Sequence, residues 1–405
     1  MKRFLLICLL CLGPLMAKET ICLNMIVKNE ARVICRCLAS VKPLIDTWVI
    51  VDTGSTDGTQ EVIREFMKDM PGELHERPWK NFAHNRNEAL DLARSKADYI
   101  LIIDADDDLV FAEGFALPKL DKDAFHMKIS HGGMVYSRPQ LIKASLGWKW
   151  EGVLHEYLSC PESSAIALME KVTMRYGGDG ARSRDPAKFR KDAEVLEEAL
   201  REDPSNSRYV FYLAQSYRDG GVHDKALENY QKRVVLGGWE QEVFVAMLQV
   251  ARLQQTLQLD PAVWIDSFYR TYLFRPSRIE PLYDLVRHHR TTGDYFAGYM
   301  LAKQGLVTAP PGDVLFVEKW IYDWGLLLEY SICAAWVGEH HEAQAASHLL
   351  LANSTLPQDV RQCVENNIRW VTAQQVQKRG NSAAAVQRRR AQAGKPVSSE
   401  TAMVR

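Results

Sequence analysis

The sequence lacks a strong net charge and, beyond its first residues, any long hydrophobic run. Its 50 Lys and Arg and 51 Asp and Glu leave a formal net charge of −1. This balance provides no overall field that would attract nucleic acid or an anionic membrane surface. No segment after residue 17 reaches the ~18 uninterrupted apolar residues of a membrane-spanning helix. We therefore expect no nucleic-acid partner and no membrane span in that part of the chain.

Beyond residue 17, the cysteines lack the paired spacing of a metal site or a redox motif. Two of the eight, Cys8 and Cys11, lie within the first 17 residues. The remaining six are scattered and contain no CxxC pair: Cys22, Cys35, Cys37, Cys160, Cys333 and Cys363. The spacing therefore supports no zinc site and no disulfide framework, and it leaves the compartment open.

The first 17 residues have the composition of a secretory signal. Lys2 and Arg3 precede an apolar run over residues 4–16, and Ala17 follows as a small residue at a possible cleavage point. This pattern favours export or membrane association. The alternative is an apolar strand or helix at the start of a cytoplasmic protein.

The rest of the chain changes character around a Gly-rich basic stretch, GGDGARSR, at residues 177–184. We interpret this stretch as a linker between residues 18–176, where strand and helix patterns alternate, and residues 185–375, where the pattern is helical throughout. Residues 376–405 contain few large apolar side chains, so the composition predicts a disordered tail.

The first domain shows repeated strand–helix units. Apolar runs over residues 20–29, 47–58 and 99–105 predict strands, the second ending in a turn, and helical periodicity follows the first two over residues 31–44 and 59–70. Such units predict an α/β fold with a mostly parallel sheet. Ligands of these sheets bind outside the carboxyl ends of the strands, which places Asn29, Asp52 and Asp104 along one rim.

Four carboxylates follow the third predicted strand: Asp104, Asp106, Asp107 and Asp108. Their mutual repulsion is costly unless a divalent cation or strong exposure to solvent offsets it. Oxygen ligands suit a hard cation such as Mg²⁺ or Mn²⁺, which can in turn bind a diphosphate. The alternative interpretation is a solvated acidic turn at the end of the strand.

These motifs together carry a family resemblance. Asn29-Glu30, VDTGSTDGT at 51–59, Arg86-Asn87 in AHNRNEAL, and ADYILIIDADDD at 97–108 resemble, in order and spacing, the family-2 glycosyltransferases of GT-A fold. The resemblance covers roughly residues 20–160. WKWEGVLHEYL at 148–158 is similar to the tryptophan-rich segment ending in His-Glu of a subset of that family.

The resemblance implies a donor-binding set made of Asn29, Glu30, Asp52, Arg86 and Asp104. Asp52 would accept a hydrogen bond from the nucleotide base, and Arg86 would steady the base or the diphosphate. Asp104 would lie nearer the ribose. The sequence carries Thr53 where many relatives have a second Asp after the strand, which weakens the assignment of base recognition.

The resemblance also implies a metal site and a catalytic base. Asp106 would bind Mn²⁺ or Mg²⁺, with His155 as a third ligand or phosphate contact; the alternative for His155 is a hydrogen-bonded structural residue. Glu156 is the first choice for the general base and Asp107 the second. The alternative for Glu156 is a salt-bridged surface residue.

The second domain resembles tetratricopeptide repeats. Between residues 208 and 232, large and small residues recur in helix–turn–helix order: Leu213, Ala214, Tyr217, Gly221, Ala226 and Tyr230. Three or more helical pairs are expected, because one pair alone cannot bury both faces. The alternative is an irregular helical bundle.

The sequence thus predicts a GT-A α/β domain followed by an all-α repeat domain. The predicted function is metal-dependent transfer of a sugar, with inversion, from a nucleotide-sugar donor to a sugar, peptide or protein acceptor, with a UDP-sugar favoured as donor. The repeats would offer a surface for a protein partner. The alternative is a non-catalytic scaffold, in which the repeats bind a protein and the first domain retains only nucleotide binding.

Overall fold

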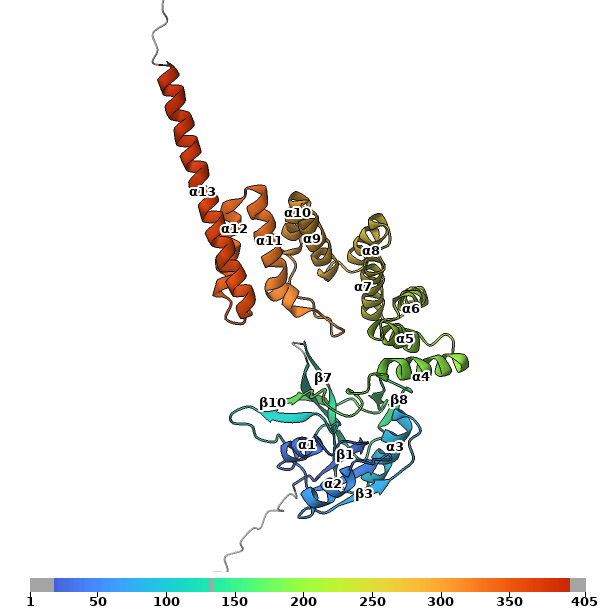
Figure 1. Ribbon diagram of the computed structural model, residues 1–405. Helices are drawn as coiled ribbons and strands as arrows, with labels where there is room; N and C mark the ends of the chain where they lie inside the picture. Colours follow the sequence, from blue (N-terminus) through green and yellow to red (C-terminus); the bar gives the residue numbers. More distant parts are fainter. Residues whose placement is uncertain (1–17, 132–133, 394–405) are drawn as a thin grey trace, which may run out of the picture. The chain divides into compact units, whose positions relative to one another are not determined.

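The computed structural model describes residues 18–131 and 134–393 (Figure 1). The predicted signal segment, residues 1–17, lies outside the described residues. Contacts between residues divide the chain into two compact units that meet between Val222 and His223. The boundary predicted from the sequence lies earlier, at residues 177–184. The helical stretch that follows this predicted linker, up to Val222, groups by its contacts with the first unit.

The first unit is built on a mixed, mostly parallel sheet of eight strands in the order β3-β2-β1-β4-β7-β6-β10-β5. Strands β1 to β4 pair in parallel around β1, whereas β7 runs antiparallel to both of its neighbours, β4 and β6. The strands are β1 (Ile21–Val27), β2 (Thr47–Asp52), β3 (Gly72–Glu76), β4 (Tyr99–Ile102), β5 (Asp108–Phe111), β6 (Ala124–His131), β7 (Met134–Lys143) and β10 (Ile166–Arg175). A separate hairpin pairs β8 (Lys149–Glu151) with β9 (Tyr157–Ser159). The sequence prediction of an α/β sheet followed by helices is confirmed.

Helices cover both faces of this sheet. In α1 (Ile34–Val41), the buried residues Ile34, Cys37, Leu38 and Val41 recur at helical spacing and form one apolar stripe. That stripe and α2 (Thr59–Met67) share one core with alternate residues of β1, whereas α3 (Phe82–Ala93) packs with the other set of strand residues. Because successive side chains of a strand point to opposite faces of the sheet, each strand contributes residues to two separate cores.

The parallel strands end side by side at one edge of the sheet. Because β2, β1 and β4 are neighbours and run in the same direction, the residues that follow them lie along that edge. Buried Asn24 in β1 fixes α3 against the sheet, since its amide donates to the carbonyl oxygens of Val49 (3.3 Å) and Ala89 (2.9 Å). The rim that the sequence predicted for Asn29, Asp52 and Asp104 is present.

Two helices, α4 (Lys188–Glu202) and α5 (Ser207–Asp219), complete the first unit. Asn206 caps α5, because its side chain accepts a hydrogen bond from the backbone N–H of Tyr209 at 3.1 Å. Of the repeat-like residues noted in the sequence, Leu213, Ala214 and Tyr217 are buried in α5.

The second unit consists of helices joined by loops, with no strand among its described residues (Figure 1). Consecutive helices contact each other from α6 to α12, and α12 contacts α13, as expected for stacked helical pairs. The helices are α6 (His223–Leu236), α7 (Glu240–Thr256), α8 (Pro261–Phe274), α9 (Glu280–Thr292), α10 (Tyr295–Gly305), α11 (Leu326–Val337), α12 (His340–Ala352) and α13 (Gln358–Ala393), with a π-helical turn η1 (Ile321–Gly325) before α11. Among the described residues, no helix combines the length and the apolar character needed to cross a membrane.

Helix α13 continues into the segment for which the sequence predicted disorder. It runs to Ala393, and residues 394–405 lie outside the described residues. Low content of large apolar residues argues against a packed core but not against a helix, because Ala, Gln and Arg are strong helix formers. A helix that has started at Gln358 can extend through such a sequence at little cost.

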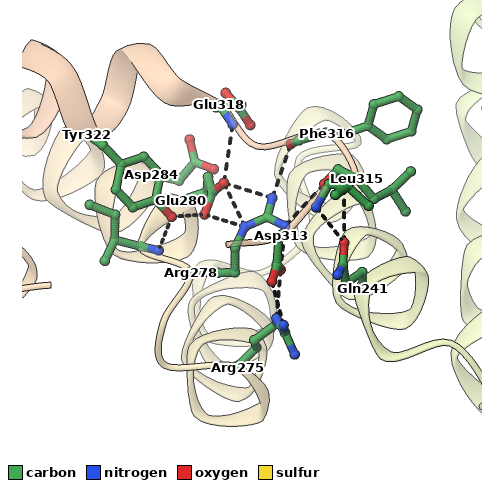
Figure 2. Close-up of polar contacts among 12 residues, drawn as sticks. Gln241, Arg275, Arg278, Glu280, Asp284, Asp313, Leu315, Phe316, Glu318 and Tyr322 are labelled. Atoms are coloured by element: carbon green, nitrogen blue, oxygen red, sulfur yellow. Dashed lines mark hydrogen bonds and ion pairs between the residues drawn. The ribbon is translucent and has the colours of Figure 1, made fainter. Parts of the chain in front are cut away.

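A buried polar network holds the segment between α10 and η1 (Figure 2). The fully buried guanidinium of Arg278 forms ion pairs with Glu280 (2.8 Å) and Asp313 (3.1 Å). It also donates to the backbone oxygens of Leu315 (3.2 Å) and Phe316 (3.1 Å). Arg278 thus contacts two carboxylates and two backbone carbonyl groups at once, and Arg275 supplies a second cation to Asp313.

We predict that Arg278→Gln destabilises the protein by about 3–5 kcal/mol, because removing the guanidinium leaves Glu280 as an uncompensated buried charge, whereas Asp313 keeps its ion pair with Arg275. Urea unfolding followed by circular dichroism measures this loss. The matched control is Arg270→Gln on α8, whose side chain is 73% exposed and pairs with Asp266. The control should change stability by no more than about 0.5 kcal/mol. Equal losses in the two variants would contradict the role given to Arg278.

Candidate active site

Asp52 ends β2 with one carboxylate oxygen in use and the other without a partner. Its Oδ1 accepts hydrogen bonds from the backbone N–H groups of Gly54 and Ser55, both at 2.8 Å. Gly54 has φ +104, which glycine adopts without strain. Asp52 Oδ2 is buried and has no hydrogen-bond partner in the part of the chain that the structure describes. An acceptor in this state is suited to a ligand that brings a donor.

Asn29 ties the end of β1 to the turn that follows β2. Its backbone is in the left-handed region (φ 60), and its side-chain oxygen accepts from the backbone N–H of Thr56 at 2.8 Å. Its own N–H donates to the Ser55 hydroxyl at 2.8 Å. Thr53, where relatives of the predicted family carry Asp, donates its hydroxyl to the Val27 carbonyl at 3.0 Å. Thr53 therefore serves the strand backbone, and Asp52 alone offers a carboxylate at this position.

Three consecutive polar residues of helix α3, Asn85 to Asn87, each contact a different part of the first unit. Asn85 is buried and holds the preceding loop, since its Oδ1 accepts from Lys80 N at 2.9 Å. Asn87 pairs twice with the backbone of Trp150 in β8, at 2.9 Å and 2.8 Å. Between them, Arg86 points to the carboxylates at the rim.

Arg86 joins two of the predicted site residues that lie far apart in the sequence. Its Nη2 donates to Asp104 Oδ1 at 2.7 Å and its Nε to Glu156 Oε1 at 2.6 Å. The guanidinium also lies over the Trp150 ring, 4.9 Å from its centroid. Burial acts to raise the pKa of Asp104, but the charge of Arg86 more than offsets it, so this pKa lies below its ordinary value. Arg86 therefore keeps Asp104 ionised beside the strand end.

Asp106 and Asp107 form no ion pair with a cation among the described residues, and their pKa values move the other way. Asp106 Oδ2 accepts from Gly180 N at 3.2 Å, and Asp107 Oδ1 accepts from Gly177 N at 3.1 Å. Burial, followed by the charge of Asp104, raises the pKa of Asp106 and raises that of Asp107 to about 7. Asp107 is 1% exposed. Negative charge at this turn is thus only partly compensated.

Asp108 belongs to the scaffold. Its carboxylate accepts two hydrogen bonds from Arg175 of β10, at 3.0 Å and 2.7 Å. Arg36 of α1 lies 3.8 Å from it. The four aspartates noted in the sequence therefore have distinct environments, and Asp108 is matched by its own cation.

We call residues 104–108 the acidic turn. The Gly-rich stretch that the sequence predicted to be a linker folds over this turn. Besides the bonds from Gly177 and Gly180, the N–H of Ala181 donates to the carboxylate of Glu30 at 3.1 Å and 3.2 Å. Burial raises the pKa of Glu30 to about 7, and the bond from Ala181 opposes this shift. Arg36 and Asp179 form an ion pair of 2.7 Å. We call residues 177–181 the glycine strap.

The glycine strap lies so close to the acidic turn that residues 177 and 180 leave no room for a side chain. A Cβ at Gly177 would lie 1.8 Å from the Asp106 carbonyl oxygen, and one at Gly180 would lie 2.8 Å from Asp106 Oδ2. The sequence signal was present in the GGDG spacing. The stretch is not the linker that the sequence predicts, because glycine here permits close packing of backbone against backbone.

His155 lies beside the site but in contact with a helix. Its backbone has φ 52, and its ring stacks on Tyr212 of α5 with 4.0 Å between centroids. Desolvation, followed by the charges of Arg182, Arg208 and Lys188, lowers its pKa. Within the described residues, no group of three or more His, Cys, Asp or Glu side chains is placed to hold a metal ion.

Two features of the site were not predicted from the sequence. Arg138 of β7 has a buried Nε without a hydrogen-bond partner among the described residues, and its charge lowers the pKa of Asp104 and Asp107. Trp148 and Trp150, which lie in the tryptophan-rich segment noted in the sequence, are buried at 3% and 7% exposure. They are core residues, and Trp150 also supports Arg86.

Comparison with known proteins agrees with this geometry for the first part of the chain. Residues 22–120 match the sequence model of Glycosyl transferase family 2, as the resemblance predicted. This range contains Asn29, Glu30, Asp52, Arg86 and the acidic turn. Glu156 and the glycine strap lie beyond it.

Curated relatives match over limited lengths. A TPR repeat-containing protein of Synechococcus elongatus is 39% identical over 99 residues, which are 24% of this chain and 23% of that protein. The SPbeta prophage-derived glycosyltransferase SunS of Bacillus subtilis is 25% identical over 233 residues, 53% of this chain and 54% of SunS. The chain thus spans between about a quarter and about half of the length of these relatives.

Among solved structures, MamA is similar with a TM-score of 0.33 and 16% identity, covering 40% of this chain and 86% of MamA. A tetratricopeptide repeat protein from Parabacteroides merdae gives a TM-score of 0.35 and 15% identity, covering 50% and 72%.

We predict that Gly177→Ala displaces the glycine strap, because its new methyl group would overlap the Asp106 carbonyl oxygen. Overpacking of this kind costs roughly 1–3 kcal/mol. Hydrogen exchange should speed up at residues 177–181, and the melting temperature should fall. Gly312→Ala is the matched control, since nothing lies within 4 Å of a Cβ there. Unchanged exchange in Gly177→Ala would show that the strap does not depend on this close contact.

Proposed function

We propose that the protein is a metal-dependent glycosyltransferase that moves a sugar from a nucleotide-sugar donor, with a UDP-sugar favoured, to an acceptor with inversion. The observation that carries this proposal is the buried, unpartnered Oδ2 of Asp52 at the rim of the sheet. It lies in the segment that matches the glycosyltransferase family, at the edge where open α/β sheets bind ligands. An N–H group of a nucleobase supplies the donor that this oxygen lacks.

Arg86 supports the same assignment on the phosphate side. Its Nε and Nη2 are engaged with Glu156 and Asp104, whereas its Nη1 has no hydrogen-bond partner among the described residues. A guanidinium fixed in this way has a donor left for a phosphate oxygen. Asn29 and Glu30 contribute to the donor side through the backbone they hold, the turn after β2 and the glycine strap.

The acidic turn fits a hard divalent cation, Mn²⁺ or Mg²⁺. Among the described residues, no arginine forms an ion pair with the Asp106 carboxylate, and burial followed by the charge of Asp104 raises its pKa. Carboxylate oxygen is the ligand type that such cations prefer. Asp106 would hold the cation together with donor phosphate oxygens, and His155 remains a further candidate ligand. When bound, the cation offsets charge on the departing nucleoside diphosphate.

Glu156 is the proposed general base. Arg86 fixes its Oε1, and its Oε2 accepts no hydrogen bond from the described residues. During transfer, the acceptor group gives its proton to Glu156 as its bond to the sugar carbon forms and the bond from that carbon to the diphosphate breaks. Asp107 has a pKa of about 7, which suits proton transfer, but its burial makes it the second choice.

The acceptor is proposed to be a sugar, a peptide or a protein, and the helical second unit to offer a surface for a protein partner. A scaffold that only binds nucleotide is the competing function. Release of UDP from UDP-glucose, UDP-galactose or UDP-N-acetylglucosamine in the presence of Mn²⁺ distinguishes an enzyme from a scaffold. Binding of all three without release of UDP from any would favour the scaffold.

We predict that Asp106→Asn abolishes the Mn²⁺-dependent part of donor binding and leaves the fold intact. A donor that binds only the folded protein raises its melting temperature, so thermal shifts with UDP-glucose, with and without Mn²⁺, measure the effect. Asp121→Asn, a change at a half-exposed carboxylate of the same unit, serves as control. An unchanged Mn²⁺-dependent shift in Asp106→Asn would refute the metal assignment.

We predict that Glu156→Gln keeps donor binding but lowers turnover by roughly 10²–10⁴-fold, the usual contribution of a positioned base. The amide oxygen can still accept from Arg86, but the amide cannot take up a proton near neutral pH. Asp107→Asn should stay within several-fold of the parent. If Asp107→Asn stops turnover and Glu156→Gln does not, the two roles are reversed.

A further inference from the structure

The loop that carries Glu156 contains two residues with left-handed backbone. It connects β8 to β9 over residues 152–156, and within it Gly152 has φ 102 and His155 has φ 52. Left-handed backbone is unfavourable for a residue with a side chain such as His155. Such a conformation persists where the surrounding structure fixes it.

Helix α3 fixes the hairpin on the side of the sheet. Asn87 pairs with both backbone groups of Trp150, and Arg86 binds the carboxylate of Glu156. These contacts hold the strand before the loop and the end of one side chain. They leave the backbone of residues 153–155 to other partners.

Helix α5 provides those partners. The N–H of Val153 donates to the Tyr209 hydroxyl at 3.3 Å, and Arg208 Nη2 donates to the His155 carbonyl oxygen at 2.8 Å. The rings of His155 and Tyr212 stack at 4.0 Å with 14° between their planes.

The Arg208 guanidinium also fastens the hairpin to α5 through aromatic faces. It lies 5.0 Å from the ring centroid of Tyr157, the first residue of β9, and 4.9 Å from that of Tyr212. A guanidinium stacks on aromatic faces as well as donating hydrogen bonds. Arg208 therefore holds the residues on both sides of Glu156, and Tyr212 stacks on His155 and also lies under the Arg208 guanidinium.

We infer that Arg208 and Tyr212 are positioning residues that hold Glu156 in its place for reaction, so that α5 is a part of the active site. This inference rests on the proposed function for the role of Glu156. Helix α5 lies outside the family-matched segment and carries the repeat-like pattern of the sequence. A helix assigned by its sequence to the repeats thus completes the acceptor side of the transferase site.

The test uses the full chain with Arg208→Gln and Tyr212→Leu. Arg208→Gln removes the planar cation, and Tyr212→Leu keeps apolar volume but removes the stacking ring. Arg201→Gln on α4 is the matched control, because its exposed side chain pairs only with Glu198 among the described residues. Circular dichroism and thermal melting verify that each variant is folded.

Two measurements are made on each variant. Hydrogen exchange of a peptide spanning residues 150–158 should speed up in both α5 variants and not in the control. Using the UDP-sugar that the parent turns over fastest with Mn²⁺, kcat should fall on the order of 10- to 100-fold, as for a misplaced catalytic group, with KM and the donor-induced thermal shift unchanged. A purely structural defect would lower the thermal shift as well.

The outcomes separate this inference from the proposed function. Unchanged exchange at residues 150–158 in both α5 variants overturns the inference, and so does faster exchange with an unchanged kcat. If the parent releases UDP from none of the sugars tested, the proposed function fails. Exchange at residues 150–158 then decides by itself whether α5 holds this loop.

Discussion

The site depends on the pairing of one guanidinium with two carboxylates. Arg86 comes from α3, Asp104 follows β4, and Glu156 lies in the loop between β8 and β9, so this pairing joins three elements at a single point. The buried amide of Asn24 anchors α3 to β1, and that anchor sets where Arg86 can reach. Without the charge of Arg86, Asp104 would add a further uncompensated carboxylate to a turn that already holds two with raised pKa values.

The four aspartates of the acidic turn have the same side chain but different partners. Asp104 and Asp108 each have arginine partners, whereas Asp106 and Asp107 accept backbone N–H groups from the glycine strap. A neutral N–H satisfies the geometry of a carboxylate oxygen but does not cancel its charge. Added positive charge at this part of the turn would offset charge that the strap leaves uncancelled.

The helical part of the chain uses buried charge differently. In the second unit, Arg278 is surrounded by acidic side chains and carbonyl groups that all belong to the scaffold, and it fixes a connecting segment of backbone. In the first unit, Arg208 uses hydrogen bonding and stacking together to hold a loop beside the proposed base. Arginine suits both tasks because its planar group offers several donors and two flat faces.

By itself, the sequence determined the first two strand–helix units and the strand before Asp104, the rim of the sheet and the identity of the residues along it. Apolar alternation and helical spacing are local patterns, and the carboxyl ends of parallel strands must meet at one edge, so Asn29, Asp52 and Asp104 could be placed without a structure. Only the tertiary structure decided which acidic residue each cation pairs with, that Thr53 turns to the strand backbone, and that residues 177–181 pack on Asp106 instead of forming a free linker. It also decided that α5 holds the loop carrying Glu156. These contacts join residues separated by 18 to 151 positions in the chain. A local pattern cannot specify them, because they depend on how whole elements pack together.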